Sequence, residues 1–275
     1  MLDTSSPTDL LALAAVLLGA GVVSGLMAGL LGVGGGAVMV PVLYQFFGFL
    51  GIDESVRMHV SVATSLAVII PTSVRSFQAH RSKGAVDMEL LRSWVVPVLL
   101  GVVVASIAAS FISGGALRVI FAVFALSVAL KLFFGNESYR LGADIPRGVL
   151  RAALGSAIGF LSTLMGIGGG TFNNTLMTLY NRPIHQAVAT SSGLGFLIAV
   201  PATLGFIWSG WGVETLPPFS LGYVSLLGVI CLLPTSVYFA PWGAKLAHRL
   251  EKRQLEIAFA VFLTIVAIRF FWTLV

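Results

Sequence analysis

Two glycine clusters are the residues of this chain whose type and spacing most directly suggest chemistry. They are Gly34, Gly35 and Gly36, in LLGVGGGAVMVP, and Gly168, Gly169 and Gly170, in LMGIGGGTFNNT. Glycine permits backbone angles that other residues rarely adopt, so each cluster predicts a break in a helix. The N–H groups that open the next helix would then be unpaired, and such a helix start attracts anions. Small residues also suit close helix packing, so an anion site and a helix contact both remain open.

Hydroxyl and amide side chains near the glycine clusters add hydrogen-bonding groups. Two matching stretches, VSVATS and QAVATS, supply the hydroxyls of Thr64, Ser65, Thr190 and Ser191. Asn173 and Asn174 follow the second cluster, where the first has Met39 and Val40. Buried amides are costly without partners, and hydroxyls in membrane helices often bond to a carbonyl of the preceding turn. We therefore expect these side chains to bind a substrate or to fix the local structure.

The distribution of charge limits the cargo. No Asp or Glu lies well inside an apolar segment, which argues against a carboxylate proton relay and against a multivalent cation. Arg75, His80 and Arg81 lie near the cytoplasmic end of the third apolar segment, where they would steer anions toward an inner mouth or mark the cytoplasmic side. We find no P-loop, metal-ligand spacing or nucleophile–base pair. The sequence thus predicts no enzyme activity, no cofactor and no metal.

Composition places the chain in a lipid bilayer. Of its 275 residues, 57% are hydrophobic and 10% are charged, against about 25% charged residues in an average soluble domain. The mean hydropathy is +0.98. The apolar runs are continuous rather than alternating, which favours helices long enough to span. The net charge of +5 comes with short basic clusters between apolar runs, as topology signals would, and does not suggest nucleic acid. An all-α polytopic membrane protein follows.

The chain contains an internal duplication. Residues 25–36 match residues 159–170, and FAVFALSVALKLFF at 121–134 matches FAVFLTIVAIRFFW at 259–272. The duplication predicts a first repeat over 1–134, a cytoplasmic linker over 135–147 and a second repeat over 148–275. The first repeat has apolar segments at 10–31, 37–50, 59–76, 92–113 and 117–134, and the second at 148–165, 171–180, 186–208, 219–240 and 254–274.

The basic residues predict that the two repeats are inverted. The loop after the third segment is basic in the first repeat, whereas the loop after the fourth is basic in the second. Lys and Arg mark the cytoplasmic side, so both termini are expected in the periplasm. The second segment of each repeat is short, which favours a broken or re-entrant helix over a full span. Inverted repeats with broken helices are typical of secondary transporters, whose sites lie near the midplane.

The chain resembles the sulfite exporter TauE/SafE family over nearly its whole length. The resemblance rests on GLLGVGGGAVMVPVL at 29–43, on LMGIGGG at 164–170, on the ATS stretch after each, and on HRSKGAVD at 80–87. It implies an inner-membrane permease that exports sulfite or organosulfonates by alternating access. Its partners would then be a small anion and a coupling ion. A permease for another small organic anion and an anion channel are the alternatives. The second repeat has Thr175 where the first has Pro41, so its substrate-facing surface is expected to be specialised.

Overall fold

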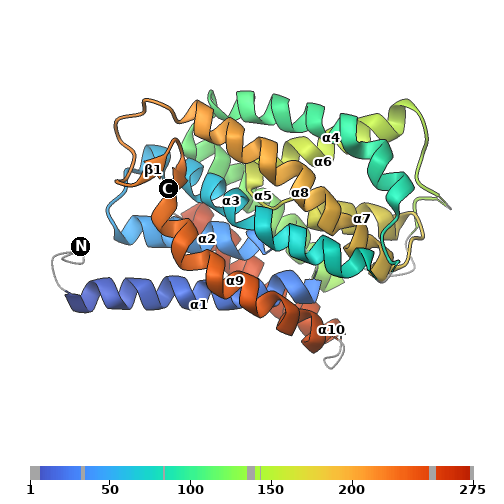
Figure 1. The fold of residues 1–275 in the computed structure, drawn as a ribbon, viewed down its shortest axis with the longest axis horizontal. Helices are drawn as coiled ribbons and strands as arrows, with labels where there is room; N and C mark the ends of the chain where they lie inside the picture. Colours follow the sequence, from blue (N-terminus) through green and yellow to red (C-terminus); the bar gives the residue numbers. More distant parts are fainter. Residues whose placement is uncertain are drawn as a thin grey trace.

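A computed structural model describes residues 7–31, 35–82, 84–134, 140–142, 144–247 and 252–272 (Figure 1). Gly34 lies outside the described residues. The described elements are α1 (Pro7–Leu31), α2 (Gly36–Phe49), α3 (Glu54–Arg81), α4 (Met88–Ala109), α5 (Gly114–Phe134), α6 (Val149–Met165), α7 (Gly170–Leu179), α8 (Ile184–Ser209), β1 (Ser220–Leu221), β2 (Val224–Ser225), α9 (Leu226–Ala247) and α10 (Lys252–Trp272). Each of the ten apolar segments corresponds to one helix, so the prediction of an all-α polytopic membrane protein is confirmed.

The start of the ninth segment was predicted wrongly. The apolar run suggested a helix from residue 219, but α9 begins at Leu226. Strands β1 and β2 come first and pair antiparallel. Phe219 and Gly222 have positive φ angles of 61° and 53°, which a right-handed helix cannot contain. A tight turn therefore replaces the first turns of the expected helix.

The two repeats complete each other's packing. Helix α1 packs along α9, and its counterpart α6 packs along α4, the counterpart of α9. Helix α3 packs against α8, and α5 packs against α10. The same arrangement thus occurs twice, with the repeats exchanged.

Glycines in matching positions make these packings close. A Cβ atom on Gly25 of α1 would lie 2.5 Å from the carbonyl oxygen of Ser236 in α9. A Cβ atom on Gly159 of α6 would lie 2.3 Å from the carbonyl oxygen of Val98 in α4. Gly21 and Gly155, one turn earlier, also face α9 and α4. Both helices therefore use a small-xxx-small contact, which is common between membrane helices.

The bundle has two chemically different ends. At the basic end, Arg182 lies 2.8 Å from Asp144 and 3.9 Å from Asp87. Three loops therefore meet there: the loop between α3 and α4, the loop before α6, and the loop between α7 and α8. At the far end, the ring Nε2 of His59 lies 3.2 Å from the Ala109 carbonyl, which brings the start of α3 to the end of α4. In Figure 1, α1 begins and α10 ends at the far end, on the left, whereas α5 ends and α6 begins at the basic end.

Helices α2 and α7 are half-spans. They have 14 and 10 residues, hence lengths of about 21 and 15 Å, and a bilayer core is about 30 Å thick. A Cβ on Gly36 would contact Ile69, midway along α3, and one on Gly169 would contact Ile198, midway along α8. The α1–α2 hairpin therefore enters from the far end and turns at mid-depth, and the α6–α7 hairpin does the same from the basic end. The structure favours re-entrant hairpins over five full crossings in each repeat.

We expect Gly36→Ala to destabilise the protein, because the added methyl group would lie 2.3 Å from the Gly166 carbonyl oxygen and 2.8 Å from Ile167 Cα. Overpacking of this kind typically costs about 1–3 kcal/mol. The measurement is the thermal unfolding midpoint in detergent. Gly19→Ala in α1 is the control, because its methyl group would meet no atom within 4 Å. Equal midpoints for the two variants would contradict this account of the contact.

Candidate functional site

The tips of the two hairpins touch at mid-depth. Gly36, the first residue of α2, lies against Gly166 and Ile167, which end the α6 side of the second hairpin. Ser65 Oγ of α3 donates a hydrogen bond of 2.8 Å to the Gly166 carbonyl. Ser24 Oγ of α1 donates one of 3.2 Å to the Gly35 carbonyl. The structure thus brings the two glycine motifs together through backbone contact, and hydroxyl groups hold both tips.

Each hairpin also presents a helix start at this depth. Gly35 and Gly169 are the N-cap residues of α2 and α7, with positive φ angles of 72° and 80° and no side-chain cap. The first N–H groups of a helix have no carbonyl partner within it. The partial positive charge of two helix starts therefore lies near the centre of the bundle.

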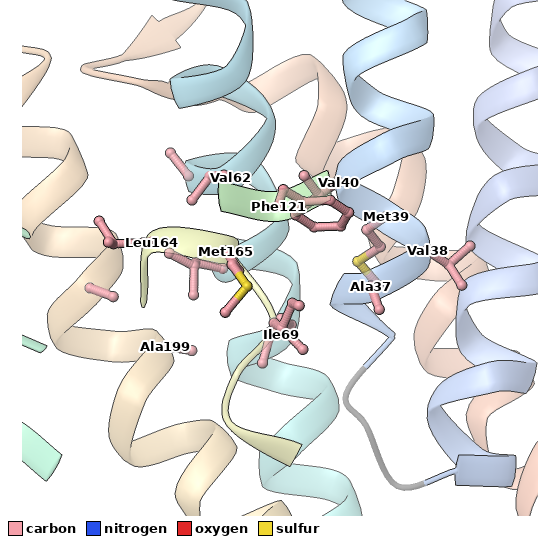
Figure 2. Close-up of a cluster of buried hydrophobic side chains, with 14 of the residues drawn as sticks. Ala37, Val38, Met39, Val40, Val62, Ile69, Phe121, Leu164, Met165 and Ala199 are labelled. Carbon is pink, nitrogen blue, oxygen red and sulfur yellow. The ribbon is translucent and has the colours of Figure 1, made fainter. Parts of the chain in front are cut away.

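The first hairpin is lined with apolar side chains. Ala37, Val38, Met39 and Val40 are at most 2% exposed. Figure 2 shows Met39 and Val40 close to Phe121, whereas Val38 points away from the other labelled side chains. These four side chains can contact a ligand through packing but cannot form hydrogen bonds with it.

The second hairpin carries buried amides at the matching positions. Asn173 Nδ2 donates to Ser191 Oγ at 2.7 Å and lies 3.4 Å from the sulfur of Met177. Ser191 Oγ donates in turn to Asn174 Oδ1 at 2.6 Å. Asn173 is fully buried, and its Oδ1 has no hydrogen-bond partner among the described residues. These three predicted site residues form one polar network.

Three further polar residues of the second hairpin were missed by the sequence analysis. Ser162, Thr163 and Thr171 are at most 9% exposed, and their hydroxyl groups have no partner among the described residues. The first repeat has Ala28, Gly29 and Ala37 at these positions. A buried hydroxyl without a protein partner is a group that a ligand or a water can satisfy. The comparison that singled out the two asparagines would have found these residues too.

The predicted threonines lie elsewhere. Thr64 Oγ1 accepts a hydrogen bond of 3.0 Å from the backbone N–H of Ser225, just before α9. Thr190 Oγ1 accepts one of 3.0 Å from the backbone N–H of Asp87, just before α4. The structure thus separates them from the asparagine network, and both bond to backbone.

Ionisable side chains are buried only at the far end, as far as the described residues extend. They are His59 and Arg118. Arg118 donates to Glu54 and, at 2.7 Å, to the hydroxyl of Tyr44. Its charge is thus already paired, away from the hairpin tips.

The predicted steering residues lie along the last third of α3, toward the basic end. Arg75 and Arg81 are exposed and His80 is half-buried. Nearby, the backbone N–H of Ile145, together with the charge of Arg182, lowers the pKa of Asp144 below its ordinary value. The basic end therefore keeps an ionised Asp144–Arg182 pair.

We expect Ser191→Ala to lower the unfolding midpoint, because it removes the hydroxyl that bonds to both Asn173 Nδ2 and Asn174 Oδ1. A buried polar group that loses its partner costs about 1–3 kcal/mol. The control is Ser127→Ala, since Ser127 lies on the exposed side of α5 and bonds only to the Val123 carbonyl. If both variants unfold at the wild-type temperature, the network does not stabilise the second hairpin.

Comparison with known proteins matches this architecture. A family model described as sulfite exporter TauE/SafE matches residues 17–270. A probable membrane transporter protein of Haemophilus influenzae is 31% identical over 91% of this chain and 95% of its own length. Probable membrane transporter proteins of Methanocaldococcus jannaschii and Bacillus subtilis (YunE) are each 24% identical, over 90% and 91% of this chain and 92% and 94% of their own lengths. No solved structure matches the chain.

Proposed function

The chain belongs to the sulfite exporter TauE/SafE family, and from this premise we propose that it moves a small sulfur-containing oxyanion across the inner membrane by alternating access. The family and the relatives make it a multi-pass membrane transporter. The oxyanion, the direction of export and the mechanism are the proposal. The site would lie where the two hairpins meet, with the starts of α2 and α7 facing the anion.

The observation that carries the proposal is that two helix starts and several buried polar side chains gather at the hairpin tips, where the described residues include no buried charge. Helix starts and amide groups can bind an anion through dipoles and hydrogen bonds alone. A buried lysine or arginine would hold an anion more tightly than a transporter that must release it requires. The proposed contacts are the backbone of Gly34, Gly35, Gly36, Gly168, Gly169 and Gly170, and the side chains of Asn173, Asn174 and Ser191.

The contrast between the hairpins favours an organosulfonate over sulfite. At matching positions the second hairpin has the buried amides Asn173 and Asn174, whereas the first has the buried apolar side chains Met39 and Val40, and we propose that these form two opposite walls of the site. A ligand with an oxyanion head and a small apolar tail would match both walls. Sulfite has no apolar part and would leave one wall without a partner.

The other predicted residues keep supporting roles in this proposal. Thr64, Ser65 and Thr190 would reach the anion only after their present hydrogen bonds to backbone groups break. Arg75, His80 and Arg81 would raise the local anion concentration at the basic end through their charge. A coupling ion would bind in addition to the anion.

We expect the double variant Asn173→Met/Asn174→Val to lose organosulfonate transport, because its second hairpin would carry the apolar residues of the first. The loss of buried hydrogen bonds worth about 1–3 kcal/mol predicts a fall in flux of about tenfold or more. The assay is uptake of labelled ethanesulfonate into proteoliposomes under a gradient, with sulfite as a competitor.

Met39→Leu is the matched control for this experiment. It changes the equivalent position of the first hairpin and keeps an apolar side chain of similar volume, so we expect flux near that of the wild type. Unchanged flux in the double variant would remove the proposed site. Single-channel currents from the wild type would exclude a carrier.

We also expect both termini in the periplasm and residue 140 in the cytoplasm. The described arginines Arg140, Arg147, Arg151, Arg182 and Arg253 lie at the basic end, and basic residues face the cytoplasm. The test labels single cysteines, introduced near each terminus and at residue 140 in a Cys231→Ser background, with an impermeant maleimide on whole cells. A C-terminal cysteine reached only from the cytoplasm would refute this orientation.

A further inference from the structure

We infer that Thr64 and Thr190 are the two gating residues of the transport cycle, one at each end of the bundle. This inference rests on the proposed alternating access. Each threonine hydroxyl holds one chain segment over the middle of the bundle, and each gate would open when its hydrogen bond breaks.

The gate at the far end is formed by the strand pair before α9. Tyr223, at the turn of this pair, stacks on His59 of α3 with ring centroids 4.9 Å apart. Its backbone N–H donates to the Phe206 carbonyl of α8 at 3.3 Å. Ser225, two residues later, donates its N–H to Thr64 Oγ1 at 3.0 Å. The strand pair is thus inserted between α3 and α8, and Thr64 holds its inner end.

The gate at the basic end is formed by the α3–α4 loop. Asp87 donates its backbone N–H to Thr190 Oγ1 of α8 at 3.0 Å. Its carboxylate lies 3.9 Å from Arg182, in the α7–α8 loop. This loop therefore spans from α3 to α8, and Thr190 holds the residue where α4 begins.

The two gates correspond in their threonine contacts. Thr64 and Thr190 occupy the same place in the repeated ATS stretches, and both are fully buried. Each accepts the backbone N–H of the residue that directly precedes the fourth helix of the other repeat. Ser225 Oγ accepts from Gly228 N at 3.2 Å, and Asp87 Oδ1 accepts from Leu90 N at 3.0 Å. Both side-chain caps therefore accept a hydrogen bond from the backbone N–H three residues later in the chain.

Such an arrangement can open one end at a time. Helix α9 packs against α1, and α4 packs against α6, so each gate segment is continuous with a helix that holds one hairpin. Thr64 lies on α3, which contacts both hairpin tips, and Thr190 lies on α8, which contacts the second tip. Release of Ser225 would free α9 with the first hairpin, and release of Asp87 would free α4 with the second. The hydrogen bond that remains at the other end keeps that end closed.

The test measures access to each side of the bundle and needs no substrate. Ser61→Cys and Ala187→Cys, each in a Cys231→Ser background, place reporters three residues before Thr64 and Thr190. Both native side chains are fully buried. The measurement is the rate of labelling by an impermeant maleimide in oriented membrane vesicles.

Thr64→Val keeps the shape of threonine but leaves the Ser225 N–H without an acceptor when the gate is closed. We expect it to raise labelling at residue 61 about tenfold, since an unsatisfied buried amide costs roughly that factor or more, without raising labelling at residue 187. Thr190→Val should do the reverse. The conservative variants Thr64→Ser and Thr190→Ser should restore wild-type rates at both reporters.

Ser225→Ala is the matched control, because it removes the side-chain cap of α9 but keeps the N–H that Thr64 accepts. We expect it to leave labelling at residue 61 unchanged. If a valine variant raises labelling at both reporters together, or at neither, the gating role is refuted. Should Thr64→Val fail to fold, Thr190→Val decides the question alone, because the prediction is selectivity between two reporters.

The outcome also separates this inference from the proposed substrate. Selective opening without organosulfonate flux would support the gates and reject the cargo. Flux that disappears in the asparagine double variant, together with unselective labelling, would support the site and reject the gates.

Discussion

The structure depends on how two broken helices are accommodated in lipid. Backbone N–H and carbonyl groups cannot be left unpaired in a bilayer, so a chain that turns at mid-depth needs other parts of the protein to cover the turn. Here the two turns cover each other, since Gly36 lies directly on Gly166 and Ile167. Ser24 and Ser65 satisfy two of the carbonyls that the breaks expose. The helices around the hairpins are arranged so that this contact is possible.

Duplication explains why the two hairpin tips meet, and the sequence differences between the two repeats explain why their hairpins carry different side chains. Two copies related by an exchange of ends bring the same glycine motif to mid-depth from opposite sides. A fully symmetric pair would present identical walls. In this chain the second hairpin has Asn173, Asn174 and Ser162 where the first has Met39, Val40 and Ala28. The fold is therefore nearly symmetric, while most of the buried polar side chains of the two hairpins lie in the second repeat.

Much of this was predictable from the sequence, and the misses have physical causes. The described helices follow from apolar runs separated by charged residues or glycine breaks, and the hairpins follow from the glycines and the shortness of the segment at 171–180. The strand pair before α9 was missed because SLGYVS at 220–225 continues without a charged residue into the apolar run of α9. The partners of Thr64 and Thr190 could not be foreseen, since a hydroxyl that bonds to a ligand and one that bonds to a distant N–H occupy the same sequence pattern.

Those threonines show how a repeated motif can be functional without touching a ligand. Repetition indicated that the ATS stretches matter in both halves, and the structure gives each half the same use for its threonine, the capture of an N-cap residue at the start of a fourth helix. The serines that follow differ. Ser65 bonds to the Gly166 carbonyl, and Ser191 bonds to Asn174. The threonine contacts that both repeats share thus hold the ends of the bundle, whereas the serine contacts that differ between the repeats lie at its centre. In the proposed transport cycle, this division would let two equivalent gates alternate around a single site that recognises one ligand.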